Sequence, residues 1–231
     1  MKFGLLLFPN LTQLDLTGPL EVFSRMNGVE TALIWKTLDP VSSDRGMRIL
    51  PTHTFEEAGK LDLVCVPGGP GQIELMSDQE TLDYLRGVAR DCKWVTSVCT
   101  GSLVLGAAGL LDGYRATSHW SSIDQLALFG ADPVFERVVR DRNRITGAGV
   151  TSGIDFALNI AADLFGDDAA RAIQLQIEYD PKPPFKDGSP RSADPGLVAE
   201  IRGDIAPFID RRRRASEAAA KVLRSRDTPA S

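Results

Sequence analysis

Residues 94–99 read Trp-Val-Thr-Ser-Val-Cys and lead through Thr100 into residues 101–111, Gly-Ser-Leu-Val-Leu-Gly-Ala-Ala-Gly-Leu-Leu. The first run is rich in β-branched and apolar residues and predicts a buried strand. The second run predicts a buried helix that packs closely through its glycines and alanines. The stretch therefore predicts a strand that passes directly into a helix, which is the repeating unit of α/β folds.

The same alternation continues on both sides of this stretch. Further strands are predicted over residues 2–8, 30–38 and 61–66, and residues 79–91 have a helical pattern. An amphipathic segment runs from Leu14 to Phe23. Short apolar strands that alternate with helices predict an α/β fold with a mostly parallel central sheet and helices on both faces.

The chain changes character after this region. In residues 134–146, two strand-like pieces flank Asp141-Arg142-Asn143 and predict a hairpin. Residues 151–178 predict two helices that separate near Gly166, with Asp167 or Asp168 as the N-cap of the second.

The composition shifts again at about residue 180. The proline-rich run Asp180-Pro181-Lys182-Pro183-Pro184-Phe185 cannot continue a helix. We expect an α/β domain over residues 1–180 and a C-terminal helical extension over 181–231 that packs on the same domain, with an amphipathic stretch at about 195–224. The basic run Arg211–Arg214 is typical of a solvated helix face, and a subunit contact is the alternative.

The composition excludes several function classes. The chain has 231 residues with a hydrophobic fraction of 43% and a net charge of −5, and its isoelectric point is about 5.1. These values predict a globular protein without nucleic-acid partners, and no apolar run is long enough to span a bilayer. Three cysteines without a CxxC motif and only two histidines argue against disulfides and against a metal site. We expect a cytoplasmic protein.

Cys99 is the first candidate for chemistry. It lies where the predicted buried strand ends and the helix begins, a position that exposes a nucleophile above the strand ends. The positive end of the helix dipole favours a thiolate there, so we expect a lowered pKa for Cys99. The alternative is a buried cysteine that acts as a small apolar residue. Cys65 lies inside a strand and Cys92 follows a polar helix, and both are weaker candidates.

Two other turns carry candidate residues. Gly68 and Gly69 follow the strand at 61–66, and the Gly69 N–H together with that of Thr100 is suited to an oxyanion-type hole. A simple tight turn is the alternative. Asp15 follows the first strand between two leucines, where a raised pKa would suit a proton donor. The alternative is that Asp15 or Thr17 only caps its helix.

His119 and Tyr179 are candidate substrate-binding residues. His119 lies 20 positions after Cys99, which leaves room for one helix and a return to the sheet, so it is also a candidate general base. A structural role beside Trp120 is the alternative. Tyr179 lies near a predicted helix end, where lining a pocket and simple packing are both open.

Four segments together resemble the ThiJ/PfpI superfamily: Leu14-Asp15-Leu16-Thr17-Gly18-Pro19-Leu20-Glu21-Val22-Phe23, Pro67-Gly68-Gly69, Ser97-Val98-Cys99-Thr100-Gly101 and Ala116-Thr117-Ser118-His119-Trp120. The resemblance implies a flavodoxin-like sandwich, a homodimer and no cofactor. It is strongest to the branch that hydrates isocyanides to N-substituted formamides, because Asp15, Cys99-Thr100 and residues 154–158 after Gly153 fit that branch.

The resemblance also implies roles for single residues. Cys99 would be the nucleophile, and a covalent thioimidate would form on it. Asp15 would be the neighbouring acid or base, and Thr100 a hydroxyl needed for activity. The amides of Gly69 and Thr100 would face the developing negative charge.

The sequence departs from other branches of the superfamily. Peptidases place a histidine directly after the cysteine, and this chain has Thr100 there. Glyoxalases and deglycases use a glutamate where this chain presents Asp15. A glyoxalase- or deglycase-like enzyme acting on small dicarbonyls remains the runner-up. A redox or small-molecule sensor that is oxidised at Cys99 is the competing reading from another class.

Overall fold

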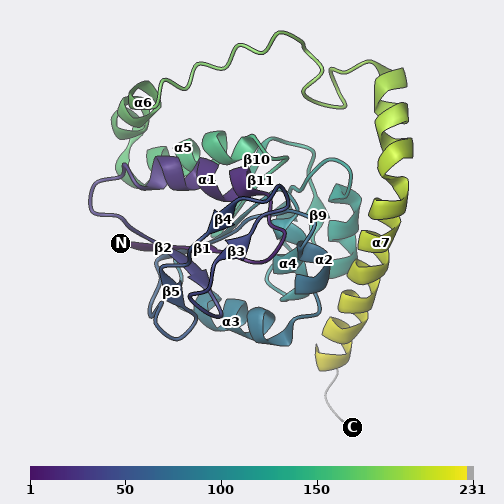
Figure 1. Ribbon diagram of the computed structural model, residues 1–231, viewed down its shortest axis with the longest axis horizontal. Coiled ribbons are helices and arrows are strands. Elements are labelled where there is room, and N and C mark those ends of the chain that lie inside the picture. Colours follow the sequence, from purple (N-terminus) through teal and green to yellow (C-terminus); the bar gives the residue numbers. More distant parts are fainter. Residues whose placement is uncertain (228–231) are drawn as a thin grey trace.

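The computed structural model describes residues 1–227 (Figure 1). Seven strands form one sheet in the order β10-β11-β7-β6-β1-β2-β5. Every neighbouring pair is parallel except β10 and β11, which are antiparallel. The strands are β1 (Lys2–Leu6), β2 (Glu30–Trp35), β5 (His53–Thr54), β6 (Leu63–Val66), β7 (Trp94–Val98), β10 (Val138–Asp141) and β11 (Arg144–Gly147).

Helices cover both faces of this sheet, and two small two-stranded sheets lie outside it. The helices are α1 (Gln13–Phe23), α2 (Gln72–Leu75), α3 (Gln79–Ala89), α4 (Gly101–Ala107), the 3-10 helix η1 (Ile123–Phe129), α5 (Ser152–Phe165), α6 (Asp167–Gln176) and α7 (Pro195–Asp227). The small sheets pair β3 (Val41–Ser42) with β4 (Arg48–Ile49) and β8 (Arg115–Ala116) with β9 (Asp132–Pro133).

The connections decide which helix covers which face. The chain moves one way along the sheet from β1 to β2 and the opposite way from β6 to β7, and right-handed crossovers therefore place α1 and α3 on opposite faces. Figure 1 shows α1 beside α5 on one face, with α3 and α4 on the other. Edge-to-face contacts from Phe23 of α1 to Phe3 of β1 and Phe156 of α5 fix the first layer, with ring centroids 5.1 and 6.3 Å apart.

The predicted α/β architecture with a mostly parallel sheet is confirmed, as is the hairpin, whose strands β10 and β11 flank residues 142 and 143. One local prediction was wrong. The N-cap of α6 is Gly166, at a φ of 86°, and Asp167 is already the first helical residue. The amphipathic stretch expected at about 195–224 is confirmed as α7, and residues 181–194 form an irregular connection to it, as the proline-rich run predicts (Figure 1).

α7 lies outside the two helix layers that cover the sheet. It contacts α2, α4 and η1. The prediction that residues 211–214 form a solvated face was only partly correct, because Arg211 and Arg214 are exposed whereas Arg212 has only 5% of its surface exposed. The buried side of α7 thus brings one arginine into the interior.

Candidate active site

Three neighbouring strands carry the candidate residues at their carboxyl ends. Asp15 follows β1, Gly68 follows β6 and Cys99 follows β7, and the order β7-β6-β1 makes these strands adjacent in the sheet. Successive strands are added in one direction from β1 to β2 and in the opposite direction from β6 to β7, so the strand order reverses between β1 and β6. Open α/β sheets bind ligands at such a point. The parallel topology therefore brings together residues that are far apart in the sequence.

Cys99 occupies a strained turn. Its φ is 56°, in the left-handed region that residues with a Cβ rarely adopt. Its N–H donates to the carbonyl oxygens of Gly147 and Ala148, at 3.0 and 2.8 Å. Its own carbonyl accepts from the hydroxyls of Ser102 and Ser118, both at 3.1 Å. Contacts from three directions thus hold the backbone of Cys99 in one conformation.

Asp15 is completely buried beside Cys99. Its Oδ2 accepts from the Gly68 N–H at 3.0 Å, while its Oδ1 has no partner of full hydrogen-bond geometry. Burial raises the pKa of Asp15 to about 7, although the Cys99 thiol and the Gly68 amide both favour the carboxylate. Helix α1 begins at Gln13 with Thr12 as its N-cap residue, and the Asp15 side chain contacts the loop after β6 instead of the start of α1. The capping alternative for Asp15 was therefore wrong.

The Cys99 thiol has a higher pKa than its position suggested. Burial and the charge of Asp15 raise the pKa of Cys99 well above its ordinary value, against the smaller opposing effects of the Thr100 N–H and Arg212. The expectation of a lowered pKa was wrong because desolvation outweighs the end of a helix of only seven residues. At neutral pH the pair therefore holds a thiol next to a carboxyl group that is about half ionised.

Thr100 links the loop after β6 to Cys99. Its Oγ1 accepts from the Gly69 N–H at 3.2 Å, and its side chain is buried. A Cβ at Gly68 would lie 2.6 Å from the Thr100 nitrogen, so the loop approaches this closely only with glycine there. The Gly69 N–H is thus engaged by a hydroxyl group, and it is the Thr100 N–H that faces the Cys99 sulfur.

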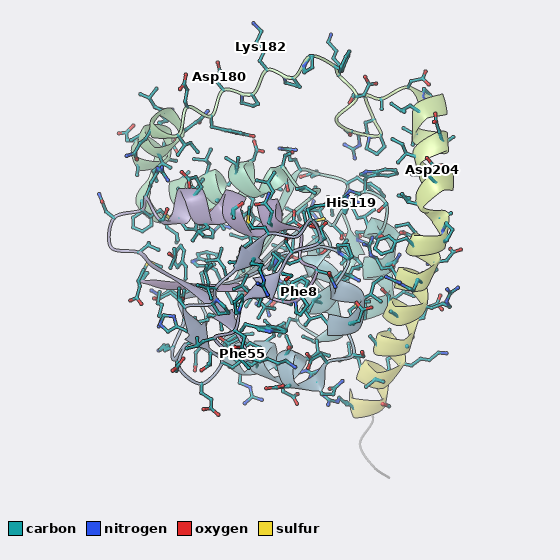
Figure 2. The ribbon with its side chains drawn as sticks, viewed as in Figure 1. Phe8, Phe55, His119, Asp180, Lys182 and Asp204 are labelled. Atoms are coloured by element: carbon teal, nitrogen blue, oxygen red, sulfur yellow. The ribbon has the colours of Figure 1, made fainter. Side chains whose placement is uncertain are left out.

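His119 lies between the sheet and α7 (Figure 2). Its Nδ1 accepts from the Ser121 N–H at 3.3 Å and is 2.8 Å from the Ser121 hydroxyl. Burial and the charge of Arg212 lower the pKa of His119 to about 4. His119 is therefore neutral at physiological pH, with its proton on Nε2.

Tyr179 belongs to a separate cluster. Its hydroxyl donates to Asp155 Oδ2 at 3.0 Å, and Arg137 binds the same carboxylate through Nε at 2.7 Å. These contacts tie the segment after α6 to the start of α5. No contact of Tyr179 found in residues 1–227 involves Asp15, Thr100 or Cys99.

Arg212 is the residue of this region that the sequence reading missed. Its guanidinium is buried, donates from Nη1 to Ser122 Oγ at 2.9 Å and interacts electrostatically with Cys99. The sequence did contain a signal for the burial of Arg212. Arg212, Ser216 and Ala220 are spaced four residues apart, which places them on one side of a helix, and all three are buried in α7. The run of four arginines obscured that pattern.

Residues 1–227 contain no cluster of three or more potential metal ligands among their His, Cys, Asp and Glu side chains. Among the same residues, no helix has the length and apolar character needed to cross a membrane.

The chain is similar to several known proteins. The chain is 52% identical to the isonitrile hydratase of Pseudomonas putida, across 98% of this chain and 99% of that protein. It is 32% identical to the transcriptional regulator GbdR of Pseudomonas aeruginosa, of which it spans about half the length (51%). The crystal structure of a ThiJ/PfpI family protein from Pseudomonas syringae superposes with a TM-score of 0.90 at 45% identity, covering 95% of this chain and 90% of that one.

A more distant structure shares the fold alone. Drosophila melanogaster DJ-1beta superposes with a TM-score of 0.69 at 24% identity, covering 77% of this chain and 97% of that one. The model of the DJ-1/PfpI family matches residues 1–163, which include β1, β6, β7 and the residues at their ends. The chain belongs to the DJ-1/PfpI family.

Proposed function

We propose that this protein hydrates isocyanides (isonitriles) to N-substituted formamides, with Cys99 as the nucleophile. The observation that carries the proposal is the 52% identity to isonitrile hydratase over essentially the whole of both chains. The local chemistry supports it, because a buried thiol lies beside a carboxyl group whose pKa is about 7. Such a carboxyl group both accepts and returns a proton near neutral pH.

The first half of the reaction forms a covalent intermediate. The thiol proton of Cys99 passes to the Asp15 carboxylate while the sulfur attacks the terminal carbon of R–N≡C. Asp15 then gives this proton to the same carbon, which yields the thioimidate R–N=CH–S–Cys99. A buried carboxyl group suits both steps because no bulk water competes for the proton.

The second half adds water to the intermediate. Asp15, again a carboxylate, takes one proton from water as its oxygen attacks the thioimidate carbon, and passes this proton to the nitrogen. Asp15 then takes the remaining proton of the new hydroxyl group as the carbon–sulfur bond breaks, gives it to the leaving sulfur, and R–NH–CHO leaves. Covalent catalysis replaces one difficult addition with two easier ones. The hydroxyl of Thr100, held by the Gly69 N–H, is placed to orient the carboxyl group or the water.

The test is formamide production from an alkyl isocyanide by the purified protein, followed by NMR. We expect turnover by wild type and none by Cys99→Ala. Cys92→Ala is the matched control, since Cys92 is also a buried thiol but lies between α3 and β7, at the amino end of the strand whose carboxyl end leads to Cys99. No formamide from wild type, with lactate formed from methylglyoxal, would identify the glyoxalase-like alternative.

The burial of Cys99 weighs against the sensor reading. A thiol with 5% exposure and a raised pKa reacts slowly with peroxide. Inactivity towards both substrate classes, combined with rapid oxidation of Cys99 by peroxide, would favour a sensor instead.

The family resemblance also underlies our proposals about organisation. We propose a homodimer in the cytoplasm, and a single unit in which the segment over residues 181–231 packs on the domain over 1–180. Sedimentation of the purified protein tests the dimer. Limited proteolysis between residues 181 and 194, followed by an attempt to separate the two pieces, tests the unit.

A further inference from the structure

The buried guanidinium of Arg212 has no anionic partner of its own. Its Nη1 donates to Ser122 Oγ at 2.9 Å, and its Cζ lies 4.6 Å from the centre of the Phe208 ring. Its Nε is buried without a hydrogen-bond partner. Asp124 of η1 forms its ion pair with Arg213 instead, and Arg212 makes no ion pair with any carboxylate of residues 1–227.

A cation in this state is expensive. Removing an ion from water carries a large free-energy cost unless a counterion compensates for it. Only 5% of the Arg212 surface reaches solvent, so free ions do not screen its charge. The charges that face Arg212 are those of Cys99 and of its neighbour Arg211. An anion bound beside the guanidinium would offset this cost.

The neighbouring groups are donors as well. Because the Ser121 N–H occupies Nδ1 of His119, the neutral ring presents Nε2–H. Arg212 keeps its Nε–H and Nη2–H edge, which is the edge that binds a carboxylate with two parallel hydrogen bonds. The Ser122 N–H donates to the His119 carbonyl at 2.9 Å, which joins the two residues into one structural unit.

This unit reaches the nucleophile. Ser118, directly before His119, donates its hydroxyl to the Cys99 carbonyl at 3.1 Å. The charge of Arg212 acts on both Cys99 and His119, so α7 contributes to the same site as the strand ends. A molecule bound covalently to Cys99 would therefore lie near the positive charge of Arg212.

We propose that Arg212 and His119 form an anion subsite beside Cys99, and that the protein acts on isocyanides that carry a carboxylate. This inference rests on the proposed hydration, and it names the class of R group. The competing role for Arg212 is to stabilise negative charge on Cys99 itself. If Arg212 binds the substrate carboxylate, its loss should affect the acid more than the ester. If Arg212 stabilises Cys99, its loss should affect both equally.

The experiment compares isocyanoacetate with its methyl ester, which differ mainly in charge. For wild type, we expect a higher kcat/KM with isocyanoacetate. Arg212→Met should lower the ratio of acid to ester activity by about 10- to 100-fold, mainly through KM, because a charge-assisted hydrogen-bonded pair is lost. Arg212→Lys should restore part of the ratio. Arg213→Met removes the next arginine and should leave the ratio unchanged.

Two results would overturn the subsite. One is an equal loss of activity on acid and ester in Arg212→Met, which would assign Arg212 to Cys99 instead. The other is unchanged activity on both compounds in Arg212→Met. Because the ratio is measured within one variant, a partial loss of folded protein does not alter it.

Failure of the proposed hydration is recognised separately. If wild type hydrates neither compound, protection of Cys99 from iodoacetamide by N-formylglycine tests the subsite without turnover. Stronger protection by N-formylglycine than by its methyl ester, lost in Arg212→Met, would support the subsite. Equal protection by the two compounds, or protection that survives in Arg212→Met, would overturn it.

Discussion

The backbone N–H of Gly68 donates to Oδ2 of Asp15 at 3.0 Å, and a Cβ at position 68 would lie 2.9 Å from the same oxygen. The residue that holds the carboxyl group in place therefore has no room for a side chain. This contact joins the loop after β6 to α1, and the same loop reaches Thr100. The loop thus sets the position of the Asp15 carboxyl group relative to Cys99.

Gly68→Ala should damage both activity and stability. The added methyl group must displace the Thr100 backbone or the Asp15 carboxyl group, which destabilises the fold by about 1 to 3 kcal/mol. A displacement of about 1 Å in a catalytic group lowers turnover by about 100-fold. Gly87→Ala is the control, because Gly87 is exposed in α3 with nothing within 4 Å of its added Cβ. Equal kcat values for the two variants would contradict this role of Gly68.

The carboxyl group of Asp15 should destabilise the folded protein above neutral pH. Its pKa is about 7 when folded and near 4 when unfolded, so the penalty is absent below pH 4, grows between pH 4 and 7 and is constant above. At about 1.4 kcal/mol for each pKa unit, the full penalty is a few kcal/mol. Asp15→Asn should therefore unfold at a higher temperature than wild type at pH 7.5 and lose this advantage near pH 4. The same advantage at both pH values would show that the effect is not ionic.

The pH dependence of turnover should report Asp15 as well. Because the proposed mechanism requires the Asp15 carboxylate to accept the thiol proton, kcat/KM for a neutral isocyanide should rise as the pH increases through about 7. His119 titrates near 4 and makes no contribution in that range. The inflection should therefore remain near 7 in His119→Gln. Its disappearance in that variant would identify His119 as the general base.

Much of the fold was predictable because local patterns and the sheet agree. The runs at residues 61–66 and 94–98 are apolar since both faces of their strands are covered, and the structure has β6 and β7 there. The short strands β3, β4, β8 and β9 were not predicted. Each has only two residues, which is too short for any periodicity to show.

The proximity of Asp15, Gly68 and Cys99 was predictable, but the electrostatics around them were not. The turns that carry Asp15, Gly68 and Cys99 are local features, and a parallel sheet brings them together. The raised pKa of Cys99 depends on how completely other elements cover it, which no local motif records. Arg212 is a similar case, since only the packing of α7 decides which of four consecutive arginines is buried.

Thr100 offers a test that separates its hydroxyl from its shape. Thr100→Val keeps the volume but leaves the buried Gly69 N–H without its acceptor, at a cost of about 1 to 3 kcal/mol. Thr100→Ser keeps the acceptor. We expect the valine variant to lose most of its kcat and some thermal stability, and the serine variant to stay within a few-fold of wild type. A valine variant as active as the serine variant would remove the hydroxyl from the mechanism.

The two serines on the Cys99 carbonyl should act on turnover without contacting the substrate. A residue at a φ of 56° is strained by about 1 to 3 kcal/mol, and the hydroxyls of Ser102 and Ser118 offset this strain. Either alanine variant keeps one donor, whereas the double variant loses both, so their effects on kcat should not be additive. Ser225→Ala, which removes an exposed hydroxyl on α7, is the control.

The distribution of these effects between kcat and KM decides whether the serines support the turn or bind the substrate. Relaxation of the turn moves the Cys99 sulfur away from the attacked carbon and from Asp15, so kcat should fall while KM stays close to its wild-type value. Direct contact with the substrate would instead raise KM in each single variant. The rate of Cys99 alkylation by iodoacetamide, measured on the same variants, should change in parallel with kcat because it depends on the same sulfur position.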